Sequence, residues 1–143
     1  MSQDRLLTEA KRWIVTAGED LEAARVLQAG EKYSHACFFS QQSAEKALKA
    51  LWYLLDGDPW GHSVQKPIEE TPDSQAQRFM TKVFDDGVYL DRYYIPTRYP
   101  NGLPDLTPGK CYFTKDAVGC LKAAENIIQR VQAWFDKHKG GSQ

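Results

Sequence analysis

The sequence predicts an all-α fold, an up-down antiparallel bundle of four helices with a short extra helix and a long loop rich in proline and tyrosine before the last helix. Two observations support this prediction. Apolar residues recur at intervals of three and four over four segments, which is the spacing of one face of an α-helix. No segment alternates apolar and polar residues as a half-buried β-strand does. Amphipathic helices joined mostly by short connections form a bundle.

The first two helices are predicted before residue 56. The apolar stripe of the first consists of Leu6, Ala10, Trp13, Ala17, Leu21, Ala24 and Leu27. Gly30 is expected to end it, because glycine tolerates a positive φ. The second is predicted over residues 32–55 and has two apolar faces, so we expect it at the centre of the bundle. Gly57 and Pro59 oppose its continuation.

The middle of the chain predicts a short helix and a long one. Residues 62–68 are expected to form one or two helical turns, interrupted by Pro67. Residues 74–90 carry apolar side chains at three- and four-residue spacing and predict a third long helix. Thr71 or Asp73 can cap it.

A long loop precedes the last helix. Residues 93–114 contain four prolines and two glycines, which exclude a regular helix or a central strand. A loop of this length inside a compact domain suggests a function or an interface. The last helix is expected to start at Thr114 or Asp116. Its stripe consists of Val118, Leu121, Ala124, Ile128, Val131 and Phe135.

Length and charge limit the domain count and the class of partner. The 143 residues fit one domain, predicted over residues 1–139, with residues 140–143 as a flexible tail. The formal net charge of -1 gives no global field that would attract a polyanion. Any contact with phosphate must therefore come from a local patch.

The three cysteines indicate neither disulfides nor a metal site. Cys37, Cys111 and Cys120 are odd in number, and none belongs to a C-x-x-C pair or lies near a histidine at ligand spacing. No triad, glycine-rich phosphate loop or metal-ligand cluster is found, so no metal and no cofactor are expected. No apolar run is long enough for a signal peptide or a membrane span. We therefore expect a soluble cytoplasmic protein.

Two segments carry a family resemblance. The run Gln41-Gln42-Ser43-Ala44-Glu45-Lys46-Ala47-Leu48-Lys49-Ala50 resembles the Gln-Gln-x-Ala-Glu-Lys-x-Leu-Lys-Ala helix of HEPN domains. The later run Tyr94-Ile95-Pro96-Thr97-Arg98-Tyr99-Pro100 resembles the Tyr-x-x-x-Arg-Tyr-Pro segment of the same family. Their order along the chain, followed by a closing helix, supports the resemblance.

The resemblance implies a fold and a class of function. HEPN domains are up-down helical bundles that form homodimers and bind nucleotides, and the C-terminal domain of sacsin looks like a distant relative. Many operate beside a small nucleotidyltransferase as one half of a toxin–antitoxin-like pair. The resemblance therefore implies a homodimer, a nucleotide such as ATP or GTP as ligand, RNA as another candidate ligand, and a nucleotidyltransferase as protein partner.

Glu45, Lys46 and Lys49 are candidate site residues on the second helix. Glu45 and Lys49 are one helical turn apart, and a solvent-exposed ion pair is one interpretation. In the other, Glu45 turns inward and binds the guanidinium of Arg98, because a buried carboxylate needs a partner. Lys46 or Lys49 would then be free for phosphate.

Arg92 and Arg98 lie close in sequence to three tyrosines of the long loop. Arginine beside aromatic rings is typical of sites that bind phosphates and stack bases, which makes Arg92, Arg98 and Tyr93, Tyr94 or Tyr99 candidates for nucleotide binding. Alternatively, Arg98 and Tyr99 form a structural clip on the bundle.

The sequence argues against RNA cleavage. Ribonuclease members of the HEPN group resemble one another in an arginine followed four to six residues later by a histidine, which can act as a general acid or base. Neither Arg92 nor Arg98 has a histidine at this spacing, so no catalytic residue is predicted. His62 is assigned a supporting role, with Glu45.

Three functions remain open. The first is a non-catalytic dimeric module that binds nucleotide or nucleic-acid phosphate. The second is a metal-independent ribonuclease that uses Arg98 with Tyr99 or His62. The third is a module for protein interaction or dimerisation, since tyrosine, tryptophan and arginine are enriched at interfaces.

Overall fold

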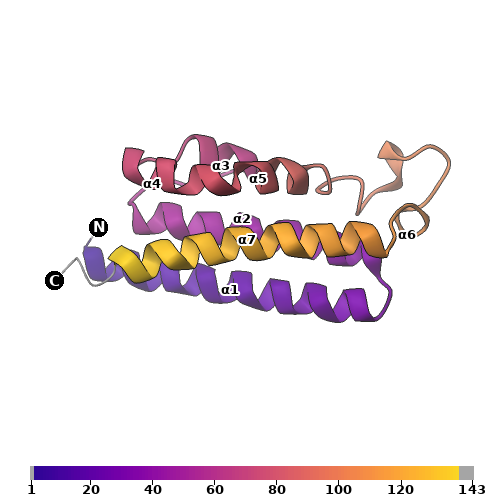
Figure 1. Cartoon of the computed structure of the whole chain (residues 1–143), viewed down its shortest axis with the longest axis horizontal. Helices are drawn as coiled ribbons and strands as arrows, with labels where there is room; N and C mark the ends of the chain where they lie inside the picture. Colours follow the sequence, from indigo (N-terminus) through magenta and orange to yellow (C-terminus); the bar gives the residue numbers. More distant parts are fainter. Residues whose placement is uncertain (1, 139–143) are drawn as a thin grey trace.

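The computed structural model describes residues 2–138, and all regular secondary structure in this range is helical. Three long helices, α1 (Gln3–Ala29), α2 (Tyr33–Leu54) and α7 (Thr114–His138), lie side by side along the long axis of the molecule (Figure 1). The predicted all-α fold class is confirmed. The predicted tail, residues 140–143, and residues 1 and 139 of the predicted domain lie outside the described residues.

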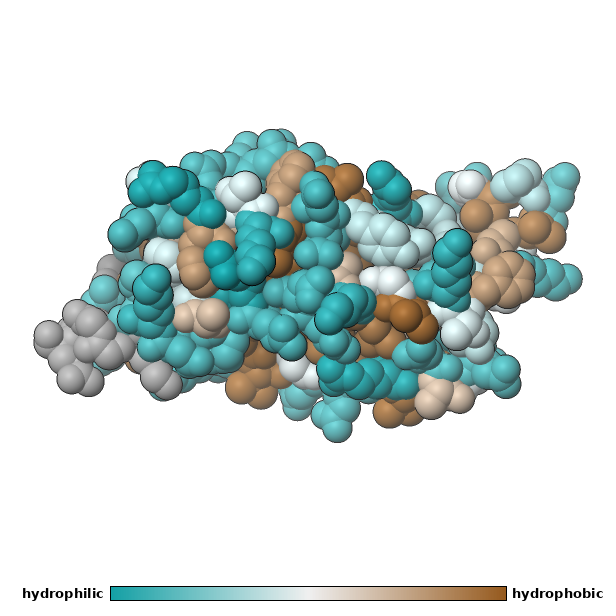
Figure 2. Space-filling view, viewed as in Figure 1, coloured by the Kyte–Doolittle hydropathy of each residue, from teal (hydrophilic) through white to brown (hydrophobic). Residues whose placement is uncertain are grey.

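Shorter helices pack beside the three long ones. These are α3 (Gln65–Glu69), α4 (Ser74–Met80) and α5 (Phe84–Asp91), and the segment that runs from α4 to α5 points opposite to α2 and α7 (Figure 1). The face formed by α1, α5 and α7 is largely hydrophilic, with scattered apolar patches (Figure 2). Within residues 2–138, we find no helix with the length and apolar character needed to cross a membrane.

Alanines set the distance between α1 and α2. Ala10, Ala17 and Ala24 recur every seven residues on α1 and are fully buried. Seven residues are about two helical turns, so these methyl groups form one buried stripe on α1, which packs mainly against α2. Small side chains let two helix axes approach closely. Since α2 also packs against α7, its predicted central position is confirmed.

The helix predicted over residues 74–90 is divided in two. A 3₁₀ turn, η1 (Thr81–Val83), separates α4 from α5. Arg130 of α7 donates from Nε to the backbone oxygen of Phe79 at 2.8 Å. In a continuous α-helix that oxygen would accept the N–H of Val83. The break therefore lies where a side chain from a distant helix binds a main-chain acceptor.

Several local predictions are refined by the structure. The positive φ after α1 belongs to Glu31 (62°), while Gly30 has a φ of -85°. Asp73 caps α4 as predicted, with its side chain accepting from the N–H of Ala76. Pro67 occupies the first turn of α3, where a missing N–H costs nothing. Val118, expected in the core, is 50% exposed.

The loop after α5 contains two short helical segments. They are η2 (Pro100–Gly102) and α6 (Pro108–Cys111), and each begins with a proline, which is favoured at the start of a helix. The remainder of this segment is irregular and extends from one end of the bundle (Figure 1). Its exposed large apolar side chains are Ile95, Tyr99, Leu106 and Phe113.

Candidate functional site

Arg98 lies among three aromatic rings. Its guanidinium carbon is 4.4 Å from the ring centroid of Tyr94, 4.7 Å from that of Phe38 and 4.9 Å from that of Tyr99. Its Nε donates to the backbone oxygen of Tyr94 at 3.1 Å. The loop supplies the arginine and two rings, and the first turns of α2 supply the third. The planar cation is therefore held in one orientation by cation–π contacts and a hydrogen bond.

A groove of about 420 Å³ adjoins Arg98. It is lined by Ser34, His35, Phe38, Phe39, Thr97, Arg98, Pro108 and Gly109. Within residues 2–138, no carboxylate comes within 4.0 Å of the Arg98 guanidinium, whereas arginine normally pairs with one where it can. The positive charge at this groove is therefore available to an anion from outside.

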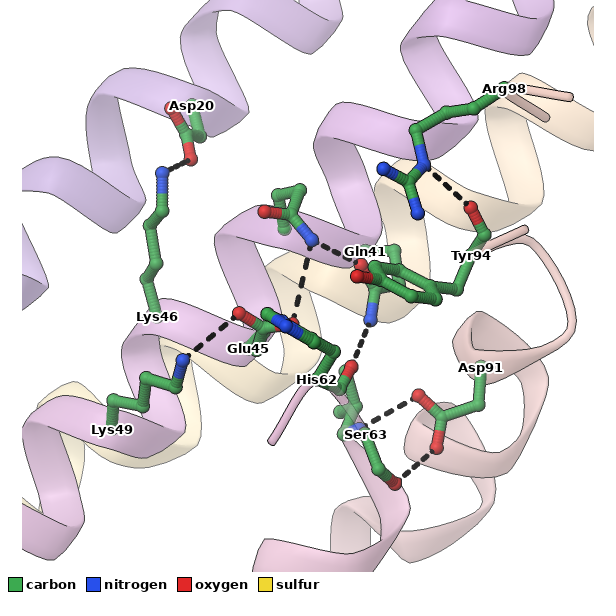
Figure 3. Close-up of polar contacts among 12 residues, drawn as sticks. Asp20, Gln41, Glu45, Lys46, Lys49, His62, Ser63, Asp91, Tyr94 and Arg98 are labelled. Atoms are coloured by element: carbon green, nitrogen blue, oxygen red, sulfur yellow. Dashed lines mark hydrogen bonds and ion pairs between the residues drawn. The ribbon is translucent and has the colours of Figure 1, made fainter. Parts of the chain in front are cut away.

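His62 lies on the same tyrosine. The rings of His62 and Tyr94 are stacked, with 5.4 Å between centroids and 15° between planes (Figure 3). Nδ1 of His62 is 3.5 Å from Oε1 of Glu45, and the His62 side chain is 64% exposed. Tyr94 thus contacts both a fixed guanidinium and an exposed imidazole.

Glu45 points inward, as one interpretation predicted, but its predicted partner is wrong. The Glu45 side chain is 4% exposed and lies 3.3 Å from Nζ of Lys49 and close to His62, not beside Arg98 (Figure 3). Arg98 rests on Phe38, which precedes Glu45 by about 10 Å along the helix axis. The ion pair with Lys49 has the predicted spacing but is largely buried, so the interpretation as a solvent-exposed pair is also wrong.

The two lysines predicted for phosphate binding are engaged elsewhere. Lys46 Nζ lies 2.6 Å from Oδ2 of Asp20 on α1. Lys49 pairs with Glu45, and its Nζ also lies 5.6 Å from the ring centroid of Trp13. Figure 3 shows Lys46 directed to Asp20 and Lys49 directed to Glu45. The expectation that one of them is free is wrong in this structure.

The two other loop residues predicted for the site, Arg92 and Tyr93, lie apart from the Arg98 site. Arg92 is exposed at the end of α5. Tyr93 packs on Tyr89 and Tyr112, and its hydroxyl donates to Asp116 at 3.1 Å. Burial raises the pKa of Tyr93 well above its ordinary value. Tyr93 therefore stabilises the join between the loop and α7 and does not lie beside Arg98.

Asp91 fixes the segment that carries His62, a role that sequence reasoning missed. Its carboxylate accepts from Ser63 Oγ at 2.7 Å, from Val64 N at 2.7 Å and from Gln65 N at 2.9 Å. Gln41, buried on α2, donates to the backbone oxygen of His62 at 2.9 Å. The position of His62 is therefore set from two sides (Figure 3).

Phe38 is a second residue that sequence reasoning did not assign to the site. Phe38 lies on α2, and nothing in its local spacing indicates that the distant loop folds back over it. The site thus consists of Arg98 with Phe38, Tyr94 and Tyr99, and of His62 behind Tyr94. It can hold an anion beside flat apolar surfaces and place an imidazole nearby. Within the described part of the chain, no three His, Cys, Asp or Glu side chains gather as a metal site.

Comparisons with known proteins agree on one family. The family model described as HEPN domain matches residues 10–134. A protein of Methanocaldococcus jannaschii named "Putative toxin MJ1304" is 30% identical over 94% of this chain and 93% of its own length.

Solved structures show the same fold. A protein from Thermus thermophilus superposes with a TM-score of 0.79 at 30% identity, covering 87% of this chain and 96% of that one. An archaeal HEPN homologue gives 0.72 at 33% identity, with coverage of 87% and 96%. An HEPN domain protein from Thermotoga maritima gives 0.65 at 27% identity, with coverage of 87% and 98%.

Proposed function

The chain belongs to the HEPN domain family, and we propose that it is a binding module whose Arg98 site takes the phosphate of a nucleotide or a nucleic acid. One observation carries this proposal: the Arg98 guanidinium is fixed between Phe38, Tyr94 and Tyr99 and has no carboxylate partner within residues 2–138. A fixed guanidinium suits phosphate oxygens, and the exposed ring of Tyr99 beside it suits the attached base. Lys46 and Lys49 have no direct part in this version of the site, because each already has a carboxylate partner.

The module is proposed to act as the HEPN half of a toxin–antitoxin-like pair, with a nucleotidyltransferase as the protein partner. The relative named as a toxin covers nearly the whole chain, which supports this proposal. We also propose a homodimer. Ile95, Tyr99, Leu106 and Phe113 are between 43% and 65% exposed in the loop region, and such side chains favour an interface.

The test of phosphate binding is calorimetry of the purified protein with ATP, GTP and a short single-stranded RNA, beside light scattering for the mass. Arg98→Ala is expected to weaken binding about tenfold to a hundredfold, since charged hydrogen bonds contribute about 1.5–3 kcal/mol. Binding should also weaken as salt rises.

Two further variants sharpen the test. Arg98→Lys keeps the charge but loses the planar fork and should restore affinity only in part. Arg78→Ala removes an exposed arginine on α4 and serves as the matched control. Wild-type affinity in Arg98→Ala would contradict the proposed site.

A second candidate function is metal-independent RNA cleavage. The observation in its favour is that Arg98 and His62 contact the same Tyr94 ring, so an arginine and a histidine are neighbours although their spacing along the chain differs from the ribonuclease motif. An imidazole can accept or donate a proton while the guanidinium binds the phosphate. Cleavage of a mixed RNA that is lost in both Arg98→Ala and His62→Gln would favour this candidate. Absence of cleavage with wild-type protein would remove it.

A further inference from the structure

Trp60 is the most exposed large apolar side chain in the described part of the chain, at 85%. It precedes Gly61, whose φ of +89° is a conformation that other residues rarely adopt. The segment that follows is fixed by the contacts of Gln41 with the His62 oxygen and of Asp91 with the Val64 N–H. Trp60 therefore directly precedes a segment whose position is fixed by the bundle.

A pocket of about 330 Å³ lies beside this indole. Its lining includes Trp52, Pro59, Trp60, His62, Lys66 and Glu70. The indole N–H of Trp52 already donates to the backbone oxygen of Pro67 at 3.0 Å, so this side chain offers the pocket its ring. Two indole rings and two prolines thus give the pocket flat apolar surfaces, as expected for a site that takes a planar ring.

The charges at the pocket indicate what kind of ring it suits. Lys66 and Glu70 contribute one positive and one negative charge, which do not favour a phosphate group. A donor and an acceptor beside aromatic walls match a nucleobase, which carries both kinds of polar group at the edge of a flat ring.

His62 connects this pocket to the Arg98 site. It lines the pocket and also stacks on Tyr94, which in turn contacts Arg98. Aromatic rings therefore lie in succession from Trp60 through His62 and Tyr94, with Lys66 at the first end and Arg98 at the other. Such a succession is typical of proteins that bind single-stranded nucleic acid.

We infer that the pocket formed by Trp52 and Trp60 binds an unpaired base of a single-stranded nucleic acid, next to the phosphate held by Arg98. This inference rests on the proposed phosphate site and extends it from one nucleotide to a strand. Trp60 supplies the stacking surface, and Lys66 and Glu70 contact the edge of the base.

The experiment measures the affinity of wild-type protein and variants for a labelled single-stranded RNA by fluorescence anisotropy, with the quenching of tryptophan fluorescence as a second signal. Trp60→Ala is expected to weaken binding about tenfold, because the variant loses the ring on which the base stacks. Trp60→Phe should restore most of the affinity. Val26→Ala removes an apolar side chain on α1 that is 69% exposed and should have no effect.

Two further probes distinguish recognition of the base from recognition of the sugar–phosphate backbone. An abasic strand of the same length should bind more weakly than the RNA and should not distinguish Trp60→Ala from wild type. A DNA strand of the same sequence shows whether the sugar matters, and equal binding of both sugars agrees with recognition of the base.

The two proposals fail in different ways. If Arg98→Ala loses binding of the RNA while Trp60→Ala keeps it, the base pocket is overturned and the phosphate site stands. If Trp60→Ala weakens binding and Arg98→Ala does not, the pocket is supported and the assignment of Arg98 is overturned. A wild-type protein that binds neither strand overturns both.

Discussion

The imidazole of His62 stacks on the ring of Tyr94, and the Arg98 guanidinium contacts the same ring at 4.4 Å from its centroid. His62 also lies 3.5 Å from the buried Glu45. The Tyr94 ring therefore lies between Arg98 of the loop and His62, which in turn contacts Glu45 of α2. Removing this ring should disturb Arg98 and His62 together.

Tyr94→Ala is expected to weaken binding of single-stranded RNA about tenfold, since cation–π contacts contribute about 0.5–2 kcal/mol. Tyr94→Phe keeps the ring and should bind nearly as the wild type does. Calorimetry gives the affinities, and circular dichroism checks that both variants are folded. A loss in Tyr94→Phe as large as in Tyr94→Ala would show that the hydroxyl, not the ring, is required.

Asp91→Ala should reduce both stability and binding. The carboxylate accepts three hydrogen bonds from residues 63–65, and loss of a comparable capping group costs about 0.5–2 kcal/mol. Asp73→Ala removes the cap of α4 and is the matched control, because it should lower stability by a similar amount without moving His62. Urea unfolding and RNA affinity are measured on both variants. Equal affinities would show that Asp91 does not position the site.

Glu45→Gln should destabilise the bundle by about 1–3 kcal/mol, because Lys49 loses its carboxylate in a largely buried place. The control is Glu9→Gln, which disrupts the Glu9–Arg12 ion pair on the surface and should cost less than about 1 kcal/mol. Unfolding in urea at neutral pH gives both free energies. Similar small losses in the two variants would contradict a buried role for Glu45.

Local spacing predicted α1, α2 and α7, because each depends on contacts within a few helical turns. Ala10, Ala17 and Ala24 are examples: their positions alone indicate the buried face. The division between α4 and α5 could not be predicted in the same way. It coincides with the contact between Arg130 and the Phe79 oxygen, which are far apart in the sequence.

For the site as well, local spacing predicts only the contacts within one helix. The pairing of Glu45 with Lys49 follows from helical spacing, whereas its contact with His62 depends on the path of the segment after α2. Arg98 and Tyr94 were recognisable as candidates, but Phe38 enters the site only through folding of the distant loop over it.

Gly119→Ala should destabilise the protein by about 1–3 kcal/mol, because an added Cβ would lie 2.3 Å from the hydroxyl oxygen of Tyr89. Tyr89→Phe removes that oxygen, so the double variant should recover part of the loss. Gly18→Ala is the control, since no atom lies within 4 Å of its added Cβ and alanine favours the helix by about 0.5–1 kcal/mol. Thermal unfolding of the four variants tests this, and a tolerated Gly119→Ala would contradict the contact.

Tyr93 should make stability depend on alkaline pH. Burial raises the pKa values of Tyr89, Tyr93 and Tyr112, so the folded protein keeps these protons above about 10, where unfolded tyrosines lose them. The unfolded state then binds fewer protons, and the free energy of unfolding falls as pH rises through this range. Urea unfolding at pH about 8 and about 11 measures the fall, which should be smaller in Tyr93→Phe. At the lower pH this variant should be less stable by about 1 kcal/mol, because Asp116 loses a hydrogen bond.

Phenolate absorbance gives an independent check of this prediction. If all seven tyrosines ionised together near their ordinary pKa, that result would contradict the burial of Tyr89, Tyr93 and Tyr112.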